Sequence, residues 1–194
     1  MKAARRSASR MSGFTMLEVL ITIIIVALGL LGVAGLQARM QVAEVESYQR
    51  AQALVLLEDM VARINANRKN SMSYVTTTAL GTDTGAMTCT GLTGAALDRC
   101  TWNNALLGAT ETSAGASMGA MIGARGCITN TVSTMPREFI VAVAWQGLAP
   151  TTAPTISTFG QGSYGNEANR RVMIARVKIG CLQNDPSTGV CVTP

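Results

Sequence analysis

The chain has 194 residues, a formal net charge of +5, five cysteines and no histidine. The missing histidine excludes Ser-His-Asp and Cys-His catalysis, histidine-ligated metals and a histidine pH switch. Four basic residues fall within the first thirteen positions, which hold no acid, so the rest of the chain carries a net charge of only +1. The basic character therefore belongs to the N-terminal tip and not to a nucleic-acid-binding face.

A long apolar run follows this tip. Residues 14–36 contain a single charge, Glu18. As a helix they would cover about 35 Å, enough to cross a hydrocarbon core of about 30 Å. The basic tip favours a cytoplasmic N-terminus, which directs the following chain to the other side of the membrane. A cleavable secretory signal fits less well, because the run exceeds the usual length of about 7–15 residues and no A-x-A-like site follows it.

Glu18 is the unusual residue of this run. A carboxylate at that depth costs about 2.5–3.5 kcal/mol on insertion scales, so it normally has a partner and a task. One interpretation is that Glu18 reaches the interface or is protonated. The other interpretation is that Glu18 pairs with a positive group at the same depth. A cut after Gly13 would create such a group, an α-amino group four residues from Glu18 in the chain.

This N-terminal pattern resembles the type IV prepilin class. The match consists of Gly13, Phe14, Thr15 and Glu18 in consecutive register, after a short basic leader and before the apolar span. The resemblance implies cleavage between Gly13 and Phe14 by a prepilin peptidase and N-methylation of Phe14. It also implies that Glu18 pairs with the Phe14 amine of a neighbouring subunit during assembly.

Further patches resemble the PilV family of minor pilins, at residues 28–37, 125–128, 141–148 and 170–172. This resemblance implies a minor pilin that primes type IV pilus assembly from the inner membrane and sits near the tip to support adhesion and motility. The implied partners are other minor pilins and the major pilin, through the N-terminal helix, and a tip adhesin. The implied locations are the inner membrane, with the head in the periplasm, and then the extracellular pilus.

The span departs from many major pilins because it contains no proline. Gly29, Gly32 and Gly35 lie within it, and each costs about 1 kcal/mol relative to alanine in a helix. Two explanations remain open. The glycines supply local softness in place of the proline, or they let neighbouring helices pack closely in a membrane.

The helical pattern continues beyond the span to about Asn65, because residues 37–66 contain neither proline nor glycine. Acids precede arginines by four residues at Glu46–Arg50 and Asp59–Arg63, the better orientation for pairs on an exposed face. One apolar stripe at helical spacing predicts a core face: Ala53, Leu57, Met60, Val61 and Ile64. We therefore expect a leader at 1–13, a membrane and assembly half-helix at 14–36, an amphipathic half-helix at 37–66 and a head at 67–194.

The head is predicted to be β-rich. Alternating apolar residues predict strands at 138–145 and 171–180, with a third candidate at 126–132 and a weaker fourth at 73–78. Both faces of 138–145 are apolar, which indicates a central strand. Residues 76–135 otherwise indicate loops, with short helical turns at 95–98 and 103–107. The expected fold class is α+β and pilin-like, with one long helix packed on a small antiparallel sheet.

The five cysteines predict disulfides, because an exported domain meets an oxidising compartment. No CxxC pair occurs, and a zinc site without histidine would need four cysteines at unhelpful spacings. We expect the two local pairs, Cys89–Cys100 and Cys181–Cys191, with Cys127 left over. A Cys127–Cys181 pair with Cys191 left over is the alternative.

No catalytic constellation is found in the sequence. Residues 160–165 fit GxGxxG, but they follow a Pro- and Thr-rich stretch and precede a strand, whereas a dinucleotide fingerprint follows a strand and opens a helix. We interpret these residues as a flexible connection. We expect no enzymatic activity, no cofactor and no metal.

The alternatives to a minor pilin are two other assembly or binding classes. A minor pseudopilin of a type II secretion system shares the leader and the long helix. A pilin that takes up DNA would need a basic stripe with aromatic residues in the head. The one local basic patch, interpreted as a solvated strand face, consists of Arg170, Arg171, Arg176 and Lys178. No nucleic-acid partner is therefore expected.

Overall fold

The computed structural model describes residues 13–108, 112–113, 116–117, 121–188 and 191–193. The predicted leader lies outside these residues except for Gly13. The chain divides into two units, Met1–Ala43 and Glu44–Pro194. The second unit is the head, and it includes the C-terminal part of the long helix.

Helix α1 (Met16–Ala66) has 51 residues and contributes to both units. It begins two residues later than the sequence indicates and ends one residue later, so the prediction of a single long helix is confirmed. Within the head, its predicted stripe is buried: Ala53, Leu57, Met60 and Ile64 are at most 2% exposed, while Val61 is half-buried beside them. The stripe is the helix's contribution to the core.

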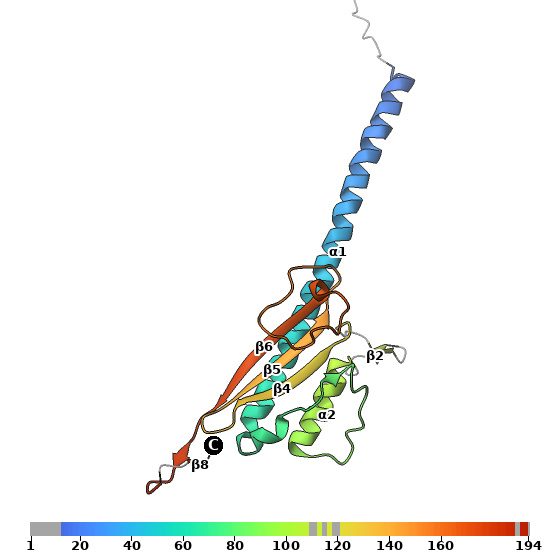
Figure 1. Ribbon diagram of the computed structural model, residues 1–194. Helices are drawn as coiled ribbons and strands as arrows, with labels where there is room; N and C mark the ends of the chain where they lie inside the picture. Colours follow the sequence, from blue (N-terminus) through green and yellow to red (C-terminus); the bar gives the residue numbers. More distant parts are fainter. Residues whose placement is uncertain (1–12, 109–111, 114–115, 118–120, 189–190, 194) are drawn as a thin grey trace, which may run out of the picture. The chain divides into compact units, whose positions relative to one another are not determined.

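A four-stranded antiparallel sheet forms the centre of the head (Figure 1). Its order is β1 (Leu80–Gly81), β4 (Arg125–Val132), β5 (Arg137–Gln146) and β6 (Arg170–Ile179). β5 lies between two partners and buries both of its faces, as its sequence predicted. The three stronger strand predictions are thus confirmed, and so is the α+β class.

The weaker strand expected at 73–78 is wrong. Residues Arg68–Tyr74 form the 3₁₀ helix η1, and the place at the sheet edge is taken by β1. The cause is Tyr74, whose ring is fully buried and whose hydroxyl donates to Asp98 Oδ2 at 2.5 Å. The helical turn that ends at Tyr74 directs this side chain inward, where it reaches Asp98.

Helix α2 (Gly94–Leu106) replaces the two short turns expected at 95–98 and 103–107. One continuous helix forms because Trp102 and Leu106 insert into the core, and Trp102 Nε1 donates to the carbonyl of Leu56 at 2.9 Å. Gly126 on β4 makes room for the indole, since a Cβ there would lie 2.4 Å from Trp102. Burial of the indole therefore ties α1, α2 and the sheet together.

One core unites these elements. It combines the α1 stripe, Trp102 and Leu106 of α2, and the inward residues of the sheet, among them Ile128, Phe139, Val141, Val143, Val177 and Ile179. The remaining elements are peripheral: the 3₁₀ helix η2 (Glu167–Asn169) and the paired short strands β2 (Thr112–Ser113) with β3 (Ala116–Ser117) and β7 (Gln183–Asn184) with β8 (Cys191–Thr193).

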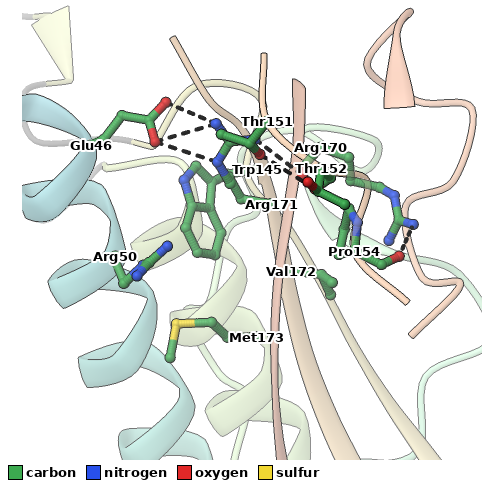
Figure 2. Close-up of a pocket in the computed structure, with 10 residues that line it drawn as sticks. All are labelled: Glu46, Arg50, Trp145, Thr151, Thr152, Pro154, Arg170, Arg171, Val172 and Met173. Carbon is green, nitrogen blue, oxygen red and sulfur yellow. Dashed lines mark hydrogen bonds and ion pairs between the residues drawn. The ribbon is translucent and has the colours of Figure 1, made fainter. Parts of the chain in front are cut away.

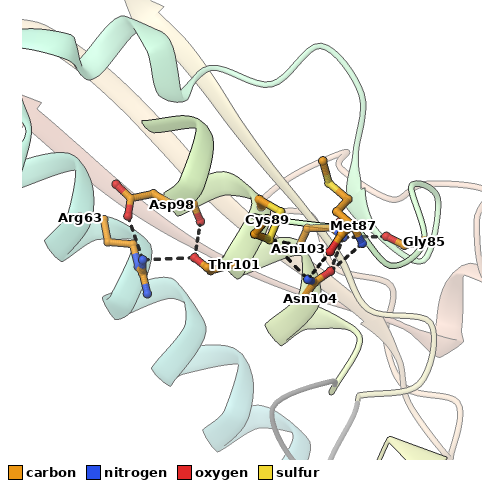
Figure 3. Close-up of a disulfide and its surroundings, with 9 residues drawn as sticks. Arg63, Gly85, Met87, Cys89, Asp98, Thr101, Asn103 and Asn104 are labelled. Carbon is orange, nitrogen blue, oxygen red and sulfur yellow. Dashed lines mark hydrogen bonds and ion pairs between the residues drawn. A yellow bond between two sulfur atoms is a disulfide. The ribbon is translucent and has the colours of Figure 1, made fainter. Parts of the chain in front are cut away.

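Two disulfides are present, Cys89–Cys100 and Cys181–Cys191, and Cys127 is a free thiol on β4. The first joins the loop before α2 to the helix itself (Figure 3). The second closes the C-terminal segment into a loop of its own. Both therefore constrain segments that carry little regular structure.

Candidate functional site

The N-terminus of α1 is built by the residues of the prepilin-like motif. Thr15 precedes the helix, and its hydroxyl oxygen accepts a hydrogen bond from the backbone N–H of Glu18 at 3.2 Å. This is half of a capping box, the S/T-x-x-E arrangement that satisfies the free N–H groups of a first helical turn. Glu18 also places its negative charge where the helix dipole is positive.

The carboxylate of Glu18 has no hydrogen-bonding or ion-pair partner among the described residues. Phe14 stands just before the helix, and its side chain is 77% exposed. The structure thus places Gly13, Phe14 and Glu18 close together along the chain, at the start of α1. Within one chain, nothing described neutralises the acid.

The apolar part of α1 is exposed along its whole length. Every residue from Gly13 to Ala43 is exposed in this chain, and α1 is long and apolar enough to cross a membrane by length and composition. A Cβ at Gly29, Gly32 or Gly35 would meet nothing within 4 Å. These glycines therefore serve no packing within this chain, which leaves both of the explanations offered for them in place.

In the head, a charged clamp holds the loop between β5 and β6, residues 147–169. Arg171 Nη2 lies 3.0 Å from Glu46 Oε1 of α1 (Figure 2). The same nitrogen donates to the carbonyl of Ala149 at 2.6 Å. The backbone N–H groups of Leu148 and Ala149 also donate to Glu46 Oε1. Gly147 permits this packing, since a Cβ there would lie 2.6 Å from the guanidinium carbon of Arg171.

These contacts lower the pKa of Glu46. Burial by itself works to raise the pKa of this carboxyl, but the hydrogen bond from Ala149, the hydrogen bond and charge of Arg171 and the hydrogen bond from Leu148 outweigh it. The pKa of Glu46 therefore lies below its ordinary value of 4.5. At neutral pH Glu46 is a carboxylate that accepts from both the loop and Arg171.

Arg170 fixes the same loop from the other side of the strand. Its Nε lies 2.6 Å from Glu167 Oε2, and its terminal nitrogens donate to the carbonyls of Pro154, Ser157 and Phe159. Side chains of successive strand residues point to opposite faces, so Arg170 and Arg171 clasp the loop from two sides. Arg170 is 3% and Arg171 is 7% exposed.

The predicted basic patch is therefore corrected. Arg170 and Arg171 are buried and ion-paired, and only Arg176 and Lys178 lie on an exposed strand face. The expected Glu46–Arg50 pair is also wrong, because Glu46 binds Arg171 instead. The Asp59–Arg63 pair does form, and Arg63 bonds Asp98 of α2 as well.

One signal in the sequence could have located the clamp. In the predicted strand 171–180, Arg171 falls on the same face as the alternating apolar residues Met173, Ala175, Val177 and Ile179. An inward arginine requires a buried carboxylate or several carbonyl acceptors. The identity of that carboxylate, 125 positions away in the chain, is not visible in any local pattern.

A second polar cluster joins α1, η1 and α2 near the Cys89–Cys100 disulfide (Figure 3). Asp98 accepts from Arg63 and from Tyr74, and burial and the Asp98 hydrogen bond raise the pKa of Tyr74. Asn103 binds the backbone of Gly81 and Gly85 through its side-chain amide, which positions β1. This cluster is structural, since its hydrogen bonds and ion pairs link α1, η1, α2 and β1 to one another.

The structure shows no arrangement that favours catalysis in the part it describes. There, no group of three or more Cys, Asp or Glu side chains gathers to hold a metal ion. The GxGxxG stretch lies within the β5–β6 loop, and its three glycines adopt positive φ angles, as turns require. It opens no α-helix, so the dinucleotide interpretation is excluded.

Comparison with known proteins agrees with the N-terminal geometry. A family model described as the prokaryotic N-terminal methylation motif matches residues 8–34. No curated protein and no solved structure matches the chain. The matched segment contains Gly13, Phe14, Thr15, Glu18 and most of the exposed apolar helix. The chain thus carries a prepilin-type leader motif, which supports the class of type IV pilins and type II pseudopilins, a structural role and anchoring in a membrane.

Proposed function

We propose that this protein is a minor pilin of a type IV pilus, of the PilV kind. The observation that carries the proposal is the methylation motif at the start of the exposed apolar part of α1. A prepilin peptidase would cut after Gly13, and Phe14 would become the methylated N-terminus of the mature protein. N-methylation leaves the new amine positively charged, as lysine methylation does.

Glu18, whose carboxylate has no partner in the described part of the chain, supports assembly through this helix. An acid in an apolar environment is stabilised by an opposite charge at the same depth, and the mature Phe14 amine of a neighbouring subunit supplies one. The pairing would align successive subunits in register. Before assembly the exposed helix is accommodated by the inner membrane, and afterwards by the helices of other minor pilins and the major pilin.

The head supports an exported location. Two disulfides stabilise segments with little regular structure, and disulfides persist in oxidising compartments such as the periplasm and the cell surface. The position near the pilus tip, the priming of assembly and the contact with a tip adhesin rest on the PilV-like patches alone. No nucleic-acid partner is proposed.

The second candidate is a minor pseudopilin of a type II secretion system. The observation that favours it is the same motif, because both classes share the leader and the long helix. The two differ in where the mature protein accumulates. A pilin is recovered in filaments sheared from the cell surface, whereas a pseudopilin stays with the cell envelope.

The experiment is to express Glu18→Ala in the native cells and measure the protein in membranes and in sheared filaments. We expect normal insertion and processing but loss from the filaments, because the pairing charge is gone. Glu44→Ala is the matched control: an exposed acid of the same helix, beyond the span, without a partner among the described residues. Equal recovery of Glu18→Ala and Glu44→Ala in filaments would contradict the proposal.

A further inference from the structure

Strand β6 lies at an edge of the sheet and pairs over ten residues with β5. On its other side, no strand of the described part of the chain pairs with it. Gly147 lies opposite Asn169 in the continuation of this pairing, and its N–H donates to the Asn169 carbonyl. In antiparallel strands, pairs that exchange hydrogen bonds alternate with pairs that do not. The backbone N–H and C=O groups that bond to β5 therefore belong to Arg171, Met173 and Ala175. The groups that point to the open edge belong to Val172 and Ile174.

A cavity of about 410 Å³ lies at this edge. Its lining includes four successive residues of β6, from Arg170 to Met173. Neighbouring strand side chains point to opposite faces, so a cavity that touches all four cannot lie over one face and must lie along the strand's edge. Figure 2 shows Glu46, Arg50 and Met173 on the α1 side of this cavity and Arg170 and Pro154 on the other.

The cavity combines apolar walls with one unused cation. Trp145, Val172 and Met173 supply the apolar surface. Arg50 of α1 is exposed and makes no hydrogen bond or ion pair with any described residue. Its nearest acid along the helix, Glu46, is occupied by Arg171. The edge thus offers backbone hydrogen bonds, an apolar floor and a positive charge without a counterion among the described residues.

We propose that an extended segment of a partner protein docks here by adding a strand to β6, with a carboxylate side chain that pairs with Arg50. The backbone groups of Val172 and Ile174 supply the main-chain bonds of the added strand, as in other cases of strand addition to a sheet edge. The Arg50 guanidinium selects an acidic residue at the end of the segment that lies against α1. This surface lies in the head and includes none of residues 14–36, the membrane and assembly half of the helix.

The test is a selection of random octapeptides displayed on phage, using the full chain in detergent micelles. We expect enriched sequences that alternate β-branched residues with polar ones and carry Asp or Glu near one end. Counter-selection against Ile174→Pro identifies the surface, because proline at an outward-facing edge position keeps the β5 ladder and blocks the added strand. Basic or non-extended sequences, binding that survives in Ile174→Pro, or no enrichment at all would overturn the proposal.

Two controls keep the result interpretable. Arg50→Gln should weaken the selected acidic peptide about fivefold, whereas Lys69→Gln, an exposed cation outside the cavity, should leave it unchanged. The odd-numbered and the even-numbered amides of the peptide form two sets, of which only one faces β6. N-methylation of that set should weaken binding at least about tenfold, and N-methylation of the other set should change it little. Equal effects of the two sets would refute strand addition even if Ile174→Pro failed to fold.

Self-association is a further outcome of the same experiment. If the chain dimerises in sedimentation runs and Ile174→Pro abolishes the dimer, the occupant is a second copy and the proposed acidic partner is wrong. The selection depends neither on leader processing nor on filament incorporation, so its failure would leave the proposed function standing.

Discussion

Replacing Glu46 with alanine tests the charged clamp that holds the β5–β6 loop. The change removes the acceptor for the N–H groups of Leu148 and Ala149 and the counterion of Arg171. Arg171 is buried, so its charge would remain in the protein with only backbone carbonyls as partners. We expect a large loss of stability in the head.

The size of the effect follows from the burial of the two partners. Removing one member of a fully buried ion pair costs about 3–5 kcal/mol. The Glu46 side chain is 23% exposed, so water screens the pair in part. We therefore expect a loss of about 2–3 kcal/mol. For a chain of this size, that lowers the melting temperature by about 4–12 °C.

Thermal unfolding of the full chain in detergent, followed by near-ultraviolet circular dichroism, measures this directly. The signal reports on the head, because both tryptophans, Trp102 and Trp145, are buried there. Glu58→Ala, an exposed acid of α1 without a partner among the described residues, is the control and should change little. The double variant of Glu46 and Arg171 should show a coupling of at least about 1 kcal/mol. Additive effects of the two substitutions would refute the clamp.

Three further predictions concern the head. Because the pKa of Glu46 is lowered, its carboxylate contributes fully to stability above the ordinary pKa of 4.5, and this contribution is lost as pH falls through the lowered pKa. The melting temperature should therefore fall more in wild type than in Glu46→Gln between about pH 6 and about pH 3. Gly126→Ala should destabilise the head by about 1–3 kcal/mol, because its Cβ would lie 2.4 Å from Trp102, while Gly180→Ala, with nothing within 4 Å, should be neutral in the same melts. Burial raises the pKa of the Cys127 thiol to about 11. Iodoacetamide should therefore label Cys127 about a hundredfold more slowly than a free cysteine at about pH 8, as followed by mass spectrometry. Labelling at the rate of a free cysteine would contradict this.

Local patterns in the sequence predicted the elements that bury a regular face. The α1 stripe follows the helical period, and the apolar residues on both sides of 138–145 indicated a central strand, because only a strand covered on both faces tolerates that composition. The prepilin-like motif at Gly13–Glu18 was equally local. It could be recognised from residue order alone.

The features that sequence reasoning missed depend on contacts between distant residues. Tyr74 turns inward because Asp98 accepts its hydroxyl, and α2 is continuous because Trp102 fits above Gly126. The burial of Arg171 depends on Glu46, at the opposite end of the head's sequence. Each of these contacts joins segments that carry no common periodicity, so propensity and spacing could not indicate them.

Mass spectrometry of surface filaments sheared from the native cells tests the pilin proposal directly. We expect an N-terminal peptide that begins at N-methylated Phe14 in that fraction. The same peptide found only in membranes would contradict incorporation into a pilus and favour the pseudopilin as the function. An intact Met1 terminus in every fraction would refute the prepilin class altogether.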